Sequence, residues 1–190
     1  MTSETMISIF LGIGLAASVG FRVFLPLFAL SLASYFGIWE LNENWLWIGS
    51  LPAIITLGVA TLVEVFAYFI PFVDNLLDSI ALPLATLAGT AVMVATIADL
   101  DPVVTWSLAI IAGGGTAAAI KGASATGRLT STTTTAGIGN PVIAFIETFT
   151  ALLFSIVSIL APVIASVLVI LLLIFIFVIY RKLRPRLSNK

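Results

Sequence analysis

The sequence GLAASVGFRVFLPLFAL, residues 14–30, places a basic residue, Arg22, and a proline, Pro26, inside an otherwise apolar segment. This apolar segment extends over residues 6–36, which is about ten residues more than the roughly 20 that one straight membrane helix needs. A proline breaks the hydrogen-bond ladder of a helix, and an overlong segment tilts or kinks in the bilayer. The sequence therefore predicts a first helix that is broken between residues 20 and 26.

The rest of the chain is equally apolar. Of its 190 residues, 61% are hydrophobic and 9% are charged, whereas soluble domains carry about 25% charged residues. A bilayer is therefore the expected solvent, and the net charge of −1 argues against a nucleic-acid partner. The chain contains no cysteine and no histidine, which excludes disulfides and most metal-ligand sets, so no metal or other cofactor is expected.

Six apolar segments are long enough to span a membrane, so we expect an all-α integral membrane protein with about six transmembrane helices in one domain. The N-terminus lacks the basic region of a cleaved signal peptide and is interpreted as the start of the first of them. The last two segments are separated only by Ala161 and Pro162, so they form a tight hairpin or one of them does not cross fully. The six segments are residues 6–36, 52–70, 80–98, 103–120, 142–160 and 163–180.

The distribution of basic residues predicts an orientation. The tail at residues 181–190 holds five of the eight basic residues, and the loops at 37–47 and 99–102 hold none. The positive-inside rule places the tail in the cytoplasm, and six spans place both termini there. We therefore expect a multi-pass protein of the bacterial inner (cytoplasmic) membrane, with Trp39, Trp45 and Trp47 forming a belt at the outer interface.

Two segments of the chain resemble each other. GIGLAASV at residues 12–19 and GGGTAAAI at 113–120 share glycines and alanines in the same pattern, and each precedes an arginine and then a proline. The pattern predicts two halves, residues 1–100 and 101–180, with opposite orientations, as in the inverted repeats of many transporters. The alternative is a chance match between small-residue faces, which let helices pack closely within one chain or in a homo-oligomer.

Four ionisable residues lie within apolar segments: Arg22, Glu64, Arg128 and Glu147. Such groups are costly in a bilayer unless they are paired or hydrated, which makes them candidates for a functional site. In one interpretation they line a polar pathway, in which a glutamate exchanges a proton or binds sodium and the arginines hold an anion. In the other they are structural ion pairs that hold the bundle together.

The sequence RLTSTTTTAGIGNP at residues 128–141 interrupts the apolar chain with hydroxyl groups. Its near-absence of charge favours a re-entrant segment before the fifth span over an ordinary cytoplasmic loop. Its hydroxyls would suit a weakly bound cation, and the helix start at Asn140 and Pro141 would suit an anion. The candidate pathway residues of this segment are Thr132, Thr133, Thr134, Thr135 and Asn140.

Asp74 and Asp78 lie one helical turn apart, where both carboxylates share a face and could hold a hard cation. The alternative is the polar face of a short interfacial helix. Enzyme motifs are absent from the sequence. Lys121 and Ser124 have the spacing of a serine–lysine dyad, but three residues is also ordinary helix spacing, so no catalytic residue is expected.

Four pieces of the chain resemble a bacterial membrane-protein family known as domain of unknown function 4126. They are residues 14–30, VEVFAYFIPFVDNLLDSI at 63–80, LAGTAVMVATIADLDP at 87–102 and GRLTSTTTTAGIGNPVIAFIE at 127–147. The resemblance implies an integral membrane domain of several helices and supplies no activity. From the residues themselves we expect a transporter or channel-like protein that moves a small solute or ion, with proton or sodium coupling. The alternative is a non-transporting scaffold that binds a partner.

Overall fold

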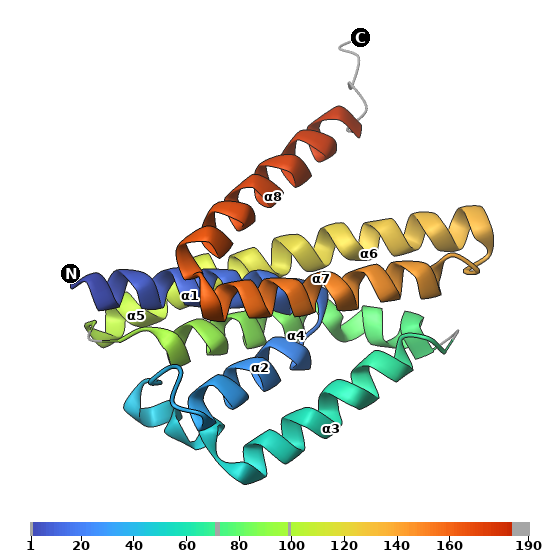
Figure 1. The fold of residues 1–190 in the computed structure, drawn as a ribbon. Coiled ribbons are helices and arrows are strands. Elements are labelled where there is room, and N and C mark those ends of the chain that lie inside the picture. Colours follow the sequence, from blue (N-terminus) through green and yellow to red (C-terminus); the bar gives the residue numbers. More distant parts are fainter. Residues whose placement is uncertain (1, 71–72, 99, 184–190) are drawn as a thin grey trace.

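The computed structural model describes residues 2–70, 73–98 and 100–183, and these residues form helices joined by short turns, with no strand among them (Figure 1). In chain order the elements are α1 (Ser3–Phe21), α2 (Phe24–Tyr35), the 3-10 helix η1 (Glu43–Gly49), α3 (Leu51–Ala67), α4 (Val73–Thr96), α5 (Pro102–Leu108), the π-helix η2 (Ala109–Gly114), α6 (Gly115–Thr135), α7 (Asn140–Leu160) and α8 (Pro162–Leu183).

The expected all-α membrane architecture is confirmed. Five helical stretches are long and apolar enough to cross a bilayer: Ser3–Phe21, Val73–Thr96, Pro102–Thr135, Asn140–Leu160 and Pro162–Lys182. The pair η1 and α3, bent by 65°, brings the number of candidate spans to six. Large apolar side chains on α3, α7 and α8 are exposed, as expected for helices that a bilayer surrounds.

The predicted break in the first segment is also confirmed, since α1 ends at Phe21 and α2 begins at Phe24. Pro26 lies in the first turn of α2, where its missing N–H has no helical partner in any case. Beyond the break the chain reverses, and α2 runs back toward the end at which α1 begins (Figure 1). The pair α1–α2 is therefore a re-entrant helical hairpin.

Hydrogen bonds show where this hairpin returns. After α2, the Trp39 indole donates to the carbonyl of Ile159 at 2.9 Å, and the backbone N–H of Asn42 donates to the carbonyl of Ala95 at 2.9 Å. These carbonyls lie at the C-terminal ends of α7 and α4, and Ala98 beside the latter donates to Ser8 in α1. We call this end of the bundle, with the start of α1 and residues 36–50, the tryptophan end, and the opposite end, where α6 meets α7, the threonine end.

The expected re-entrant or polar loop before the fifth span is wrong. Residues 115–135 form α6, which continues α5 and η2 in one helical run, so Thr132, Thr133, Thr134 and Thr135 are helical. The hydroxyl groups of this segment are compatible with a helix, because those of Thr133, Thr134 and Thr135 donate to backbone carbonyls four residues earlier. Each hydroxyl is thus satisfied by its own helix, and only residues 136–139 connect α6 to α7.

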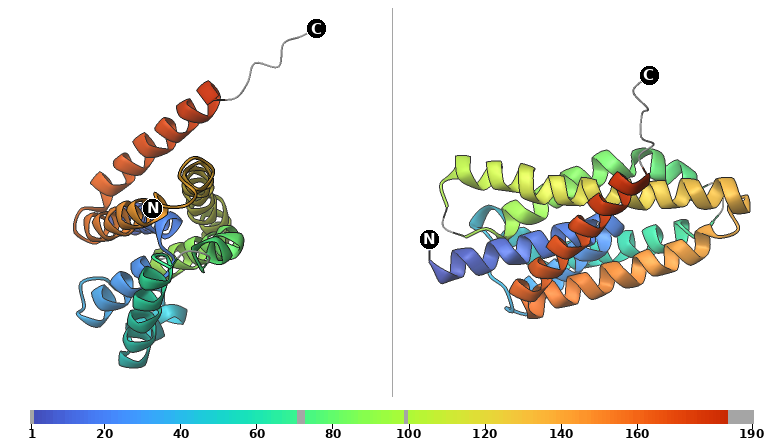
Figure 2. Two further views of the ribbon diagram at one scale, coloured as in Figure 1. Left: turned by 90° about the vertical axis from the view of Figure 1, so that its right-hand side faces the viewer. Right: turned by 90° about the horizontal axis from the view of Figure 1, so that it is seen from above.

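The two copies of the glycine motif lie in α1 and in the run from η2 to α6. Both start at the tryptophan end and run in the same direction (Figures 1 and 2), so the opposite orientation expected for an inverted repeat is not found for this pair. The motif's role is close packing: a Cβ on Gly20 would lie 2.6 Å from that of Ile120, and one on Gly113 2.6 Å from the carbonyl oxygen of Gly89. These glycine faces are buried within the chain, which leaves only the open side of α6, at Gly115, Gly122 and Gly127, for packing against another molecule.

The helices α5 and α7 begin in different ways. Asp101 caps α5, since its carboxylate accepts the backbone N–H of Val103 at 2.8 Å. Asn140 does not cap α7, because it is the first helical residue and its amide contacts other side chains. At the other end of α7, Ala161 and Pro162 form a tight turn into α8, which diverges from the bundle (Figure 2).

Candidate functional site

The break between α1 and α2 lies in the interior, and two charged residues from other helices satisfy its backbone groups. The carboxylate of Glu64, in α3, accepts the backbone N–H groups of Val23 at 2.8 Å and Phe24 at 3.0 Å. The ammonium of Lys121, in α6, donates to the carbonyl of Phe21 at 3.1 Å. An anion therefore lies at the start of α2 and a cation at the end of α1, the arrangement that the helix dipoles favour.

Arg22, the residue at the break, points toward α7. Its Nε donates to the hydroxyl of Thr148 and its Nη2 to the carbonyl of Ala144, both at 2.9 Å. Its Nη1 lies 3.4 Å from a carboxylate oxygen of Glu147. Arg22, which makes the first apolar segment costly to place in a bilayer, is thus bound by residues 144–148, about one turn of α7.

Glu147 joins the two arginines that the sequence singled out. Arg128 donates to its carboxylate through both Nε and Nη2, and the hydroxyl of Ser124 donates to it as well. The other carboxylate near Arg128 is that of Asp78, in α4, at 3.8 Å from Nε. Glu147 is therefore the central acceptor of the cluster.

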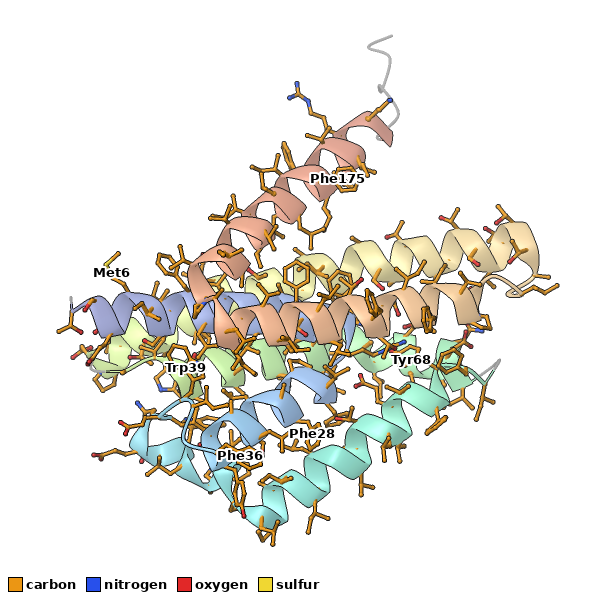
Figure 3. All side chains as sticks on the ribbon, in the orientation of Figure 1. Met6, Phe28, Phe36, Trp39, Tyr68 and Phe175 are labelled. Atoms are coloured by element: carbon orange, nitrogen blue, oxygen red, sulfur yellow. The ribbon has the colours of Figure 1, made fainter. Side chains whose placement is uncertain are left out.

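One aromatic ring lies beside all three buried cations. The ring centre of Tyr68 is 4.1 Å from Cζ of Arg22, 4.5 Å from Cζ of Arg128 and 5.7 Å from Nζ of Lys121. Figure 3 shows Tyr68 inside the bundle, whereas Phe36 and Phe175 project from its surface. Cation–π contacts of this kind stabilise a positive charge by about 0.5–2 kcal/mol, so Tyr68 offsets part of the repulsion among the cations. We call Arg22, Lys121, Arg128, Tyr68 and Glu147 the cationic cluster.

Several donors of the cationic cluster are unused. Arg22, Lys121 and Arg128 are 0%, 1% and 2% exposed, yet Nη1 of Arg22 and Nη1 of Arg128 have no hydrogen-bond partner in the described part of the chain. Lys121 donates one hydrogen bond there, to Phe21, although an ammonium has three protons to donate. Buried polar groups are nearly always hydrogen-bonded, so unused donors on buried cations call for an acceptor, and for Nη1 of Arg22 the nearest one is the carboxylate of Glu147 at 3.4 Å.

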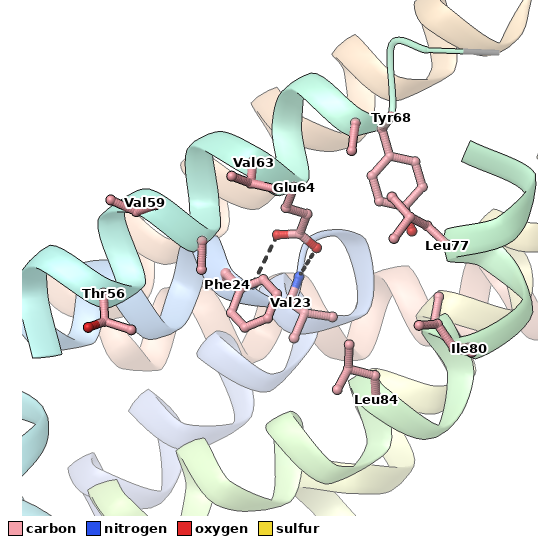
Figure 4. Close-up of a pocket in the computed structure, with 13 residues that line it drawn as sticks. Val23, Phe24, Thr56, Val59, Val63, Glu64, Tyr68, Leu77, Ile80 and Leu84 are labelled. Carbon is pink, nitrogen blue, oxygen red and sulfur yellow. Dashed lines mark hydrogen bonds between the residues drawn. The ribbon is translucent and has the colours of Figure 1, made fainter. Parts of the chain in front are cut away.

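Two cavities reach members of the cationic cluster. The first, which we call the groove, is an apolar cavity of about 400 Å³ between α3 and α4 (Figure 4). Glu64 and Tyr68 lie along its wall, together with apolar residues such as Val59, Val63 and Leu84. The second, which we call the cleft, is a cavity of about 290 Å³ between α4 and α6, and it is polar. It is lined by Asn75, Asp78, Ser79, Ala125, Arg128, Leu129 and Thr132.

A smaller polar network lies at the threonine end. The amide nitrogen of Asn140 donates to Asp74 at 2.9 Å and to the hydroxyl of Thr132 at 3.0 Å, so α4, α6 and α7 are joined there. Asp74 also accepts the backbone N–H of Asn75. Asp74 and Asp78 belong to the first turns of the long helix α4 and not to a short interfacial helix. Since Asp78 faces Arg128, the pair has different neighbours, and the described residues hold no group of three potential metal ligands.

The structure thus brings together Arg22, Arg128 and Glu147, with Glu64 at the neighbouring break. Of the threonine tract, only Thr132 lines an opening, whereas Thr133, Thr134 and Thr135 are exposed and bonded to their own helix. Lys121 and Ser124 bind different partners and do not form a dyad.

Two members of the cluster, Lys121 and Tyr68, were not among the sequence candidates. In the sequence, Lys121 directly follows the predicted span at 103–120 and is considered only as the partner of Ser124 in a dyad. The signal that places it in a helix is the absence of proline from residue 103 to residue 140. Tyr68 has no local signal, because its role depends on cations that come from three separate helices.

Comparison with known proteins identifies a family but no characterised relative. The model of the family described as "Domain of unknown function (DUF4126)" matches residues 9–182. No curated protein and no solved structure matches the chain. The function must therefore be argued from the site.

Proposed function

The chain belongs to the family described as domain of unknown function DUF4126, and on that basis we propose a membrane transporter that binds an anionic solute at the cationic cluster. The family description carries no activity, so the proposal rests on the geometry. It names a transporter and not an enzyme, because the one hydroxyl paired with a carboxylate in the cluster, that of Ser124, donates to Glu147, which the two arginines already engage and so make a weak base.

The observation that carries the proposal is the set of unused donors on the three buried cations. A network that served only to join helices would leave few such donors, because each costs about 1–3 kcal/mol of desolvation, and more on a charged group. Here Nη1 of Arg22, Nη1 of Arg128 and Lys121 each retain donor capacity beside the ring of Tyr68. An anion placed among them would supply the missing acceptors.

The cleft and the groove supply separate approaches to this site, since Arg128 lines the cleft and Tyr68 lines the groove. Arg22 and Lys121 line neither opening, which corresponds to an occluded state of an alternating-access cycle. Among the carboxylates, Asp78 is the best placed for proton or sodium coupling. It lies in the cleft and is 18% exposed, whereas both oxygens of Glu64 are held by backbone amides.

The scaffold alternative is less well supported. It required free glycine and alanine faces, yet Gly12, Gly14, Gly20, Gly113 and Gly114 all face neighbouring helices of the same chain. What remains is the open side of α6 and the exposed surface of α8.

We further propose that the threonine end faces the cytoplasm and the tryptophan end faces the outside of an inner membrane. Glu4, Glu40, Glu43 and Asp101 belong to the tryptophan end, whereas the buried cations lie toward the threonine end. The positive-inside rule, which counts basic residues in loops and tails, gives this orientation, because residues 36–50 and 97–102 at the tryptophan end contain no lysine or arginine, whereas Arg181 and Lys182 lie at the far end of α8. Because α1–α2 re-enters, it changes the expectation for the N-terminus, which would lie outside while the tail stays in the cytoplasm.

Cysteine labelling tests this topology, since the chain has no native cysteine. In right-side-out vesicles we expect Ser3→Cys and Asn44→Cys to react with a membrane-impermeant maleimide, and Thr133→Cys to react only after permeabilisation. Reaction of Ser3→Cys and Asn44→Cys from opposite sides would contradict the re-entrant hairpin.

Transport is tested with the purified chain in liposomes. Solid-supported-membrane currents are recorded on concentration jumps of sodium chloride, nitrate, acetate and phosphate, at two pH values and with potassium in place of sodium. We expect a current for at least one anion, and a reduction of tenfold or more in Lys121→Gln. Glutamine can still donate to the carbonyl of Phe21 and leaves the pairs of Glu147 intact, so the variant should fold. The matched control is Lys182→Gln, the same change at an exposed position of α8.

The measured currents distinguish a supporting outcome from a contradicting one. An anion current that Lys121→Gln abolishes and Lys182→Gln preserves supports transport through the cationic cluster. Currents no larger than those of protein-free liposomes for every anion would overturn transport of small inorganic anions and acetate, and equal currents in the two variants would overturn transport through the cationic cluster.

A further inference from the structure

We infer that the anion is the headgroup of a membrane lipid, whose acyl chain lies in the groove. This inference rests on the proposed function and names the substrate class of the same site. It joins two features that lie on either side of Tyr68: an apolar cavity between α3 and α4, and the unused donors of the cationic cluster.

The groove has the composition and the opening that an acyl chain requires. Apart from Thr56, Glu64 and Tyr68, its lining residues are apolar. Val59, Val63 and Ile80 are all more than half exposed on the outer surface of the bundle, so the groove opens sideways toward the hydrocarbon of the bilayer (Figure 4). The helix α3 packs mainly on α2, which leaves its other side facing this cavity.

The length of the groove matches one leaflet. Its wall on α3 extends from Thr56 to Tyr68, which at 1.5 Å per residue is about 18 Å. Half of a hydrocarbon core of about 30 Å is about 15 Å. A lipid chain can therefore occupy the groove along its whole length while its head reaches the level of Tyr68.

Charge complementarity decides the headgroup. Beyond Tyr68 lie Arg22, Lys121 and Arg128, with donors that no described residue accepts. The one carboxylate in the groove is Glu64, and both of its oxygens accept backbone N–H groups at the start of α2. Glu147 pairs with both arginines and Asp78 lies 3.8 Å from Nε of Arg128, so the ammonium of Lys121, which pairs with no carboxylate among the described residues, is the charge that favours an anionic head over a zwitterionic one.

The cleft is a poorer route for this ligand. Its lining includes the carboxylate of Asp78, which repels an entering anion, and it has two apolar residues, Ala125 and Leu129, where the groove has ten. A small inorganic anion, in contrast, would make no use of the groove. Tyr68 separates the groove from the cations, so its ring must move aside for the head to pass.

The inference is tested by lipid binding to the full chain. The protein is delipidated in detergent and titrated with dioleoylphosphatidylglycerol or with dioleoylphosphatidylcholine, and bound lipid is counted by native mass spectrometry. Val59→Trp fills the groove from an exposed position, and Val167→Trp makes the same change at a similarly exposed position of α8 outside it. Lys121→Gln tests whether the cationic cluster binds the headgroup, with Lys182→Gln as its control.

We expect phosphatidylglycerol to bind at least tenfold more tightly than phosphatidylcholine. Val59→Trp should reduce its binding tenfold or more, and Lys121→Gln should abolish the preference for the anionic lipid, while both control variants behave as the unmodified chain. Because Val59 is exposed, the tryptophan should not prevent folding, and Val63→Trp repeats the test from a second position on the same wall.

The failure of this inference differs from the failure of the proposed function. Equal binding of the two lipids, or binding that Val59→Trp and Val63→Trp leave unchanged, overturns the lipid assignment. An inorganic-anion current that still depends on Lys121 would then leave the transporter proposal standing. If the chain showed neither a lipid preference nor any anion current, both the lipid assignment and the transporter proposal would be overturned.

Discussion

Glu147→Gln is expected to lower the free energy of unfolding by about 3–5 kcal/mol, the usual cost of removing one partner from a buried ion pair. The carboxylate accepts two hydrogen bonds from Arg128 and one from Ser124, and it lies 3.4 Å from Nη1 of Arg22. Glutamine would leave the buried guanidinium of Arg22 without a counter-charge and that of Arg128 with Asp78 alone, 3.8 Å from its Nε. For a chain of this size the loss corresponds to a fall of roughly 6–20 °C in the unfolding temperature.

The measurement is thermal unfolding in detergent, with Glu43→Gln as the matched control because Glu43 is exposed at the tryptophan end. The double variant Glu147→Gln, Arg128→Gln should recover part of the loss, since it removes one of the two cations that pair with Glu147. If Glu147→Gln unfolded at the same temperature as Glu43→Gln, the pairing of α6 with α7 described above would be wrong.

Glu64→Ala is expected to destabilise the backbone at the break between α1 and α2. Its carboxylate accepts two backbone N–H groups, and each charge-assisted hydrogen bond contributes about 1.5–3 kcal/mol. Alanine should therefore cost about 3–6 kcal/mol. Glutamine, which keeps one acceptor oxygen, should cost roughly half as much.

Hydrogen exchange locates the effect of these substitutions. In Glu64→Ala the amides of residues 22–26 should exchange faster, while those in the middle of α7 should keep their protection. Glu40→Ala, at an exposed position after α2, should leave both regions unchanged. Equal protection of residues 22–26 in Glu64→Ala and Glu40→Ala would exclude a capping role for Glu64.

These two predictions change how transport and scaffolding are to be distinguished. Substitution of either glutamate alters stability whatever the protein does, because Glu147 holds two arginines and Glu64 holds the start of α2. Lys121 is the better probe, since it donates one hydrogen bond to a backbone carbonyl and pairs with no carboxylate among the described residues.

The sequence predicted those features that have a local cause. The apolar segments follow from composition, and the break follows from Arg22 and Pro26 standing close together in one of them. Arg22, Arg128 and Glu147, selected from the sequence, lie together in the structure, because a charge in an apolar segment needs a partner wherever that partner comes from.

The features that the sequence did not predict depend on contacts between distant segments. Glycine and threonine have low helix propensity, so residues 122–135 resemble a loop. They continue a helix whose preceding residues, 113–120, pack closely on α1 and α4 at Gly20 and Gly89, and Arg128 within them bonds to Glu147 of α7. Lys121 was missed for the same reason, since the carbonyl that fixes it lies 100 residues earlier in the chain.

The re-entrant hairpin α1–α2 has a consequence for biogenesis. Arg22 leaves the ribosome early, but Thr148, to which it donates, follows 126 residues later. Glu64 and Lys121, which satisfy the two helix ends at the break, also come from later segments. A nascent first segment with an unpaired arginine at membrane depth is costly to release into lipid, by about 2.5–3.5 kcal/mol on insertion scales. The residues around Arg22 can therefore reach their final contacts only after α7 has been synthesised.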